Sequence, residues 1–226
     1  MRLENPAVLT REGADWRLAP TTIALDGGRA TLAGTWGQTP SISATIRDFN
    51  LTSLEEIGAL NVSGVLSAEA RVVLPAGGLP AGSVNLNIRN FSRSGLALTS
   101  APVNLEVVAA GRGQAIATRG YVRRQGRALG AFQVALMPIP SSGASTTARL
   151  LAAPLQGLLR LQGPAEAIWP LAGIETVDVR GPIAVAANIS GRAGDPLVSG
   201  VVRTTRARIE SASTGTVITN AALNGR

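Results

Sequence analysis

The densest cluster of charged side chains is a run of arginines around one tyrosine. It reads Arg119-Gly-Tyr-Val-Arg-Arg-Gln-Gly-Arg127. The planar guanidinium of arginine matches phosphate oxygens, so one interpretation of this run is a contact with a phosphate or a lipid headgroup. The pair Gln125-Gly126 is also a turn signal, and a turn here would make the run a solvated hairpin. We favour the hairpin.

The remaining polar motifs offer little chemistry. Glu55 and Glu56 are the only adjacent carboxylates, and a position at the start of a helix explains them. Gly111-Arg-Gly113 lacks the third glycine of a dinucleotide-binding loop, and the chain has no phosphate-binding Gly-Lys-Ser/Thr motif. These motifs do not support a nucleotide-driven activity.

Two residue types that dominate catalytic chemistry are missing. The chain has no Cys and no His. This excludes metal sites built from those residues, Cys–His nucleophiles and Ser–His–Asp triads. No dense Asp/Asn loop is present to build an oxygen-only metal site. We therefore expect a protein that is not an enzyme and that has no metal or cofactor.

The net charge of +7 comes from 21 basic residues, all of them arginine, against 14 acidic ones. A basic surface suits phosphate groups or anionic lipids and equally suits an ordinary soluble protein. We expect no nucleic-acid partner.

Alternation of apolar and polar residues recurs along the chain and predicts β-strands. The longest case runs from Leu60 to Leu74, with Asn61, Ser63 and Ser67 at the opposite positions. Short Gly/Pro/Asn turns separate the strands, and Asp26-Gly27-Gly28 is a strong hairpin signal. The sequence therefore predicts an all-β fold, an antiparallel meander.

Two segments interrupt the alternation and predict short helices. Ser53-Leu-Glu-Glu56 is a capping box, which places a helix near 54–59, and Pro164 opens a second candidate near 164–172. A shift of 117 residues brings the two helices and their following strands into register, with Gly64 on Gly181. We expect two repeat units, 1–140 and 148–226, joined by the Ser/Thr-rich stretch between them.

The composition raises the question of what covers the apolar side of these strands. Apolar residues make up 45% of the chain, but aromatic residues only 3%. A β-sandwich core usually depends on aromatic side chains. An ordinary protein core and a non-protein ligand are both open interpretations at this point.

Three phrases of the second unit carry a family resemblance. They are Ala153-Pro-Leu-Gln-Gly-Leu-Leu-Arg-Leu-Gln-Gly163, Ile168-Trp-Pro-Leu171 and Ile189-Ser-Gly-Arg-Ala-Gly-Asp-Pro-Leu-Val-Ser-Gly200. In this order they resemble the middle region of the TamB family, the AsmA-like subunits of the translocation and assembly module, which are related to bridge-like lipid-transfer proteins. The membrane anchor and the C-terminal domain of that family have no counterpart here, so we expect an internal piece of a longer protein.

The resemblance implies a long sheet curled into an open β-groove, with one or two short helices between the repeat units and a concave face lined by aliphatic side chains. It implies a segment of a periplasm-spanning, inner-membrane-anchored protein of the cell envelope. The groove would conduct phospholipids between the inner and outer membranes, with their acyl chains as its ligands. An outer-membrane assembly partner of the TamA type would bind through parts not present in this chain.

Two alternatives stay open. The groove could assist the assembly of outer-membrane proteins such as autotransporters, as a chaperone does. The chain could also be a structural β-solenoid or an adhesin stalk, with a closed core. On the lipid interpretation, the groove-lining side chains are Leu60, Val62, Leu66, Ala68, Val72, Val84, Leu86, Ile88, Val177, Val179, Ile183, Val185 and Ile189.

Overall fold

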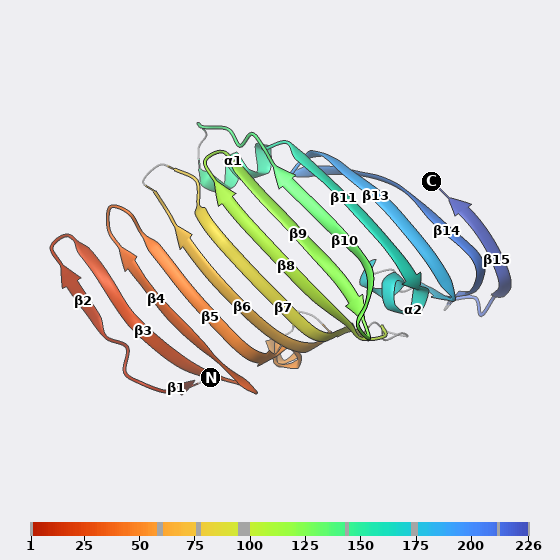
Figure 1. Ribbon diagram of the computed structural model, residues 1–226, viewed down its shortest axis with the longest axis horizontal. Coiled ribbons are helices and arrows are strands. Elements are labelled where there is room, and N and C mark those ends of the chain that lie inside the picture. Colours follow the sequence, from red (N-terminus) through yellow and green to blue (C-terminus); the bar gives the residue numbers. More distant parts are fainter. Residues whose placement is uncertain are drawn as a thin grey trace.

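The computed structural model shows one continuous antiparallel sheet of 15 strands (Figure 1). It describes residues 2–57, 61–75, 78–94, 100–142, 145–172, 176–211 and 213–225. Most strands pair with their neighbours in the sequence, and the sheet does not close into a barrel. The prediction of an all-β antiparallel meander is confirmed.

The strands and helices follow one another in a simple order. The strands are β1 (Arg2–Leu3), β2 (Leu9–Glu12), β3 (Asp15–Leu25), β4 (Gly28–Trp36), β5 (Ser41–Asn50), β6 (Val62–Val73), β7 (Ala81–Arg93), β8 (Val103–Arg112), β9 (Ala115–Arg124), β10 (Arg127–Leu136), β11 (Leu155–Pro164), β12 (Val177–Arg180), β13 (Pro182–Arg192), β14 (Asp195–Ser211) and β15 (Val217–Gly225). The helices are η1 (Leu51–Ile57), α1 (Thr146–Ala152), α2 (Ala165–Ile168) and η2 (Trp169–Ala172).

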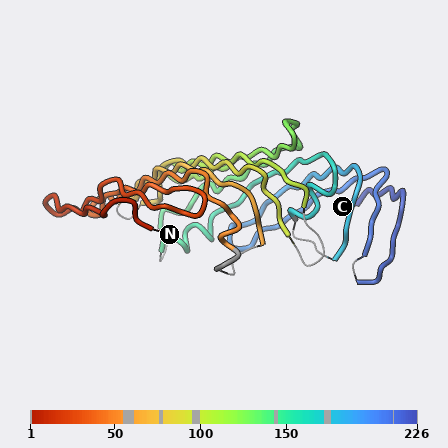
Figure 2. Tube along the Cα trace, turned by 90° about the horizontal axis from the view of Figure 1, so that it is seen from below, coloured from red at the N-terminus to blue at the C-terminus, as the bar shows by residue number. Residues whose placement is uncertain are grey.

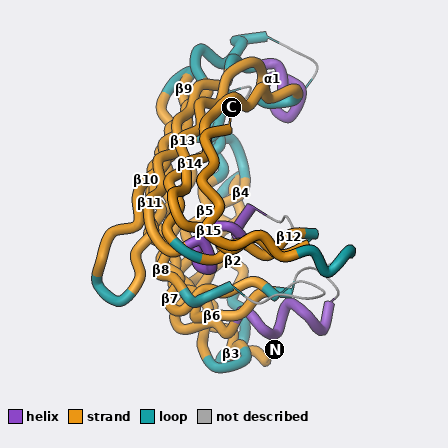
Figure 3. Tube along the Cα trace, turned by 90° about the vertical axis from the view of Figure 1, so that its right-hand side faces the viewer, coloured by secondary structure: helices purple, strands orange, loops and turns teal. Residues whose placement is uncertain are grey.

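The sheet is a single curved layer. Seen from its end, it forms an arc with the short helices on the inner side (Figure 3), and the view from below shows the strands within one layer (Figure 2). We call the side that carries the helices the concave face and the other side the convex face. The expected curled, open groove therefore matches the shape of the sheet.

β-Bulges contribute to this curvature. Asp48 in β5 and Asn90 in β7 have positive φ angles of 54° and 53°, and the strand registers shift beside both residues. A bulge adds one unpaired residue to a strand, which bends it and increases its twist. Both bulges lie at the same end of the strands, on either side of β6, so they bend this end of the sheet together.

The predicted helices are found with changed bounds. A 3-10 helix, η1, takes the place of the helix near 54–59, and residues 58 and 59 lie outside the described residues. Helices α2 and η2 together cover nearly all of the expected 164–172 segment. Helix α1 was not predicted, although Ser145 caps it by accepting a hydrogen bond from the Ala148 backbone N–H at 3.1 Å.

The two predicted repeat units are joined within the sheet rather than separated. Strand β10 of the first pairs with β11 of the second, from Gly130 opposite Leu161 to Leu136 opposite Leu155. Gly64 and Gly181 both have positive φ angles, 134° and 104°; Gly64 lies in β6 beside a register shift, whereas Gly181 lies between β12 and β13. The repeat itself remains a prediction.

Two small apolar cores lie on the concave face, one at each of the two sides of the sheet where the strands end. At one edge, Ala165, Ala167 and Ile168 of α2 pack with Leu161 of β11 and Ile183 of β13. At the other edge, Leu79, Ile139 and Ala153 are buried together, and Leu150 of α1 packs against them. The helices therefore cover the edges of the concave face.

Candidate functional site

Two uninterrupted rows of small or apolar residues cross the concave face between these cores. Opposite residues in adjacent antiparallel strands lie on the same face of a sheet. The registers of β5 to β11 and β13 therefore define the rows. One row is Ala44, Ala70, Val84, Ala109, Thr118, Val134, Gly157 and Ile189; the other is Ile46, Ala68, Leu86, Val107, Gly120, Phe132, Leu159 and Ala187. We call these residues the apolar floor.

The apolar floor is half-buried, not buried. All of its members are partly exposed except Gly120. A second layer packed on a sheet excludes the side chains beneath it from water. Ile183, which lies under helix α2, shows this effect, since only 3% of its surface is exposed. Among the described residues, the main contacts between elements other than neighbouring strands are those of α2 and of η1 with β6. Within the described ranges, no second layer therefore lies over the middle of the floor.

The dimensions of the floor suit a hydrocarbon chain. It crosses eight strands that lie about 4.8 Å apart, and so extends over roughly 30 Å. The floor has no charged side chain, and Thr118 supplies its single hydroxyl. Phe132 lies across Gly120 of the next strand, where an added Cβ would come within 2.5 Å of the ring. The arrangement offers continuous apolar contact without a polar anchor.

The predicted groove-lining residues divide into four groups. Leu66, Ala68, Val72, Val84, Leu86, Ile88 and Ile189 lie on the concave face and are half-buried. Val177 and Val185 pack against the core under α2 and keep part of their surface exposed. Val62, Val179 and Ile183 are buried, with 7%, 6% and 3% of their surface exposed. Leu60 lies outside the described residues.

The buried residues are left out of the candidate lining for a physical reason. Val179 and Ile183 are covered by helix α2, which folds back over the end of the sheet. The alternation identifies the face on which they lie, but not the segment that covers it. A ligand in the groove would not reach these side chains.

The predicted lining missed the middle of the sheet. Strands β8 to β11 contribute Val107, Phe132, Val134 and Leu159 to the apolar floor. The signal that finds them is the same apolar–polar alternation, which these strands also show.

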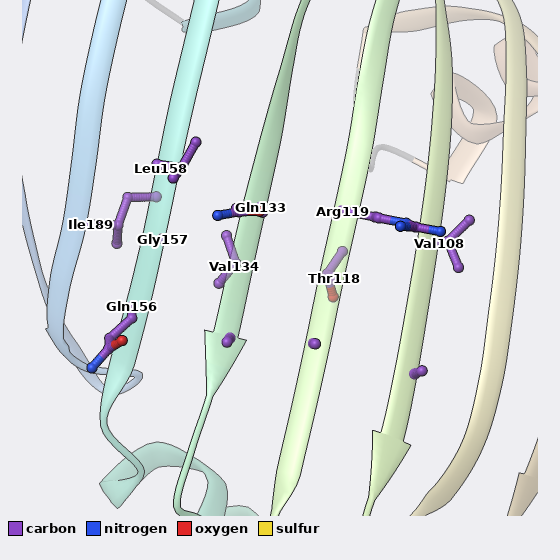
Figure 4. Close-up of a pocket in the computed structure, with 12 residues that line it drawn as sticks. Val108, Thr118, Arg119, Gln133, Val134, Gln156, Gly157, Leu158 and Ile189 are labelled. Atoms are coloured by element: carbon purple, nitrogen blue, oxygen red, sulfur yellow. The ribbon is translucent and has the colours of Figure 1, made fainter.

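The convex face is polar and basic. Its strand positions include Arg29, Arg47, Arg71, Arg89, Arg119, Arg123, Arg160 and Arg203, against the carboxylates of Glu69 and Glu106. Among these, Arg123 lies 3.4 Å from Glu106, in an exposed ion pair. A depression of about 680 Å³ lies on this face beside Arg119, Gln133 and Leu158 (Figure 4).

The arginine-rich run from Arg119 to Arg127 forms the hairpin we favoured. Strands β9 and β10 flank Gln125 and Gly126, whose φ angles are 49° and 79°. Two positive φ angles in a two-residue loop are typical of the type I′ turn, whose twist matches that of the strands.

One described group has a shifted pKa. The Arg180 guanidinium donates a hydrogen bond from Nε to Asp178 Oδ2 at 2.8 Å, and this bond and the attraction of the carboxylate raise its pKa. The pair lies on β12, away from the apolar floor. Among the described residues, no group of His, Cys, Asp and Glu could hold a metal ion.

Comparisons of the chain with models of protein families, with curated proteins and with solved structures found no match. Within the described part of the chain, none of the helices has the length and apolar character that crossing a bilayer requires. The candidate site therefore rests on the geometry of the apolar floor.

Proposed function

We propose that the apolar floor carries phospholipid acyl chains, and that the chain is a non-enzymatic segment of a TamB-like conduit between two membranes. The observation that supports this most is the half-exposure of two continuous rows of residues across eight strands. Folded monomers rarely leave large contiguous apolar patches in water, and such patches mark interaction sites. On this proposal, the protein works in the periplasm as part of an inner-membrane-anchored protein.

The energetics favour an open groove for this task. Each methylene costs about 0.8 kcal/mol to expose to water. A phospholipid has roughly thirty of them, so its exposure costs on the order of 20 kcal/mol. A continuous apolar surface replaces most of that water contact. The floor residues are mainly Ala, Val, Leu and Ile, so no position binds an acyl chain much more strongly than the next. A lipid can therefore move along the floor.

The shape of the cross-section suits a lipid with a polar head. The helices cover the concave face only near its edges. Acyl chains on the floor would therefore lie in the trough, while the headgroup would reach water through the open side. A closed cavity would instead have to enclose the polar headgroup, at a large desolvation cost.

The test uses two neighbouring valines of β8. Val107 lies on the apolar floor, and Val108, with 40% of its surface exposed, lies on the convex face. A photo-crosslinking amino acid is placed at each position in separate variants, which are purified without detergent and irradiated. We expect phospholipid adducts in the mass spectrum at position 107 and none at position 108. Equal labelling at both, or labelling at neither, would refute the proposal.

The chaperone hypothesis has one structural observation in its favour. Strand β15 pairs only with β14, so its other edge is free among the described residues, and Ile218 and Leu223 on it are about half exposed. An unpaired strand edge can add another strand. Crosslinks from β15 to an unfolded outer-membrane strand, with none from Val107 to lipid, would support this role instead.

The third hypothesis finds less support. A β-solenoid or a stalk of that type encloses a dry core, whereas this sheet is a single open layer. The buried clusters of the described residues lie at the edges of the sheet, and the floor between them stays half-exposed.

A further inference from the structure

We infer that the convex face carries an oxyanion site formed by Arg160 and Arg203, with Arg127 at its edge, and that its ligand bears a phosphate group. This inference concerns the face opposite the apolar floor and does not depend on the proposed lipid conduit.

The three arginines line one depression. It has a volume of about 730 Å³ and lies over β10, β11, β13 and β14. Ala184 and Ala186 of β13 lie between the strands that carry Arg160 and Arg203, because Arg160 is opposite Ala186 and Arg203 is opposite Ala184. These short side chains form the low part of the surface, and the longer arginines form its walls. A second depression of about 550 Å³ adjoins it at Arg203.

Hydrogen bonds hold the Arg160 guanidinium in place. Its Nη1 donates to the carbonyls of Leu159 and Ala187 at 2.8 and 2.9 Å, and its Nη2 donates to Asn188 Oδ1 at 3.0 Å. A guanidinium has five N–H donors. The Nε–H and one Nη2–H of Arg160 therefore stay available, on a side chain whose orientation is already fixed.

The Arg203 guanidinium makes one hydrogen bond and keeps more N–H donors available than Arg160 does. Its Nε donates to Asn224 Oδ1 of β15 at 3.2 Å. Both terminal nitrogens, with four N–H groups, make no hydrogen bond within the described structure. This is the fork with which arginine binds the oxygens of a phosphate in a bidentate manner.

No carboxylate neutralises this site. In the described ranges, none of the three arginines forms an ion pair, and no acidic residue lines the depression. Elsewhere on the sheet, Arg89 and Arg123 do have carboxylate partners. The three uncompensated positive charges favour an anion of more than one charge, such as a phosphate ester, over a single carboxylate.

The size of the depression indicates that the ligand is larger than a phosphate group. The depression is much larger than one phosphate group, and the apolar side chain of Val201 lines it as well as the arginines. The ligand therefore carries its phosphate on a larger group. A lipid headgroup at a membrane surface and a soluble phosphate compound share this chemistry, and the experiment has to distinguish them.

The test compares two double variants of the full chain. Arg160→Gln with Arg203→Gln removes the site, and Arg47→Gln with Arg71→Gln removes the same charge from exposed positions elsewhere on the convex face. Binding of inorganic pyrophosphate is measured by calorimetry at about 0.15 M salt, where the Debye length is about 8 Å. Binding to phosphatidylglycerol vesicles, with phosphatidylcholine vesicles as the reference, is measured by sedimentation. Circular dichroism and thermal melts check that both variants keep the fold.

We expect the first variant to weaken binding of at least one probe by about tenfold or more, because charge-assisted hydrogen bonds are lost. The control variant should change it by less than about twofold, since exposed charges beyond the Debye length contribute little. An effect on pyrophosphate indicates a soluble ligand, and an effect on the vesicles alone indicates a headgroup. Equal losses in both variants, or no binding of either probe to the unaltered protein, would overturn the inference. Lipid adducts at Val107 should be unaffected by either outcome.

Discussion

Arg89 Nη2 lies 2.6 Å from Asp48 Oδ1, and this ion pair connects the bulges of β5 and β7 across β6. The backbone N–H of Asp48 donates to Ser67 Oγ at 3.2 Å, and that of Asn90 donates to Asn104 Oδ1 at 2.9 Å. A side chain of the neighbouring strand thus satisfies a backbone donor that each bulge leaves without a strand partner. These contacts fix where the sheet bends.

The first prediction concerns the bulge at Asp48. Asp48→Ala should lower the free energy of unfolding by about 1–2 kcal/mol, because alanine tolerates a left-handed backbone poorly and forms no ion pair. Asp48→Asn keeps a residue that accepts this conformation and should lower it by less than about 1 kcal/mol, since the lost pair is exposed. Urea unfolding measures both. Equal losses would show that the backbone conformation is not the main contribution.

The second prediction concerns the core under helix α2. Ile168 is buried, with 4% of its surface exposed, so Ile168→Ala should lower the free energy of unfolding by about 2–4 kcal/mol. Leu197 has 61% of its surface exposed, and Leu197→Ala should change it by less than about 0.5 kcal/mol. Both are measured by urea unfolding. A small effect at Ile168 would mean that α2 does not pack on the sheet as described.

The third prediction concerns the close approach of β6 and β7. Gly82 has a φ of +146°, and a Cβ there would overlap the Arg71 carbonyl oxygen. Gly82→Ala should therefore disrupt this pairing and destabilise the protein by more than about 3 kcal/mol. Gly113 has a φ of +56° with open space around it, so Gly113→Ala should cost only about 1 kcal/mol. Thermal melts of the two variants should differ clearly, and similar melting temperatures would contradict the described register.

Much of the fold follows from local pattern. In a strand the side chains alternate between two faces, so the alternation in β6 and β7 already separates Leu66 and Leu86 from Ser67 and Asn85. Turn chemistry does the same for the hairpin at Gln125 and Gly126. These signals depend on residues close in sequence, which is why they can be read without the structure.

What covers a face depends on contacts distant in sequence. Val179 and Val107 have the same character in the sequence, yet Val179 is buried beneath α2 and Val107 is half-exposed. The difference arises because 165–172 folds back over the end of the sheet, which alternation cannot encode. The convex arginine site was missed for a similar reason: Arg160 and Arg203 are far apart in the chain and meet only through the registers of β11, β13 and β14.

The fourth prediction tests the apolar floor with one change on each face of β8. Val107→Asp places a carboxylate where acyl chains would lie, and an aspartate in a hydrocarbon environment is unfavourable by about 2.5–3.5 kcal/mol. We therefore expect the affinity for a fluorescent long-chain phospholipid, measured by titration with detergent-free protein, to fall roughly sixtyfold to three-hundredfold. Val108→Asp adds the same charge one residue away on the convex face and should leave this affinity within about twofold, because it does not contact the floor. Circular dichroism shows whether each variant remains folded. If both variants bind lipid as the unaltered protein does, acyl chains do not lie on these rows; if both lose binding equally, net charge rather than the floor determines the affinity.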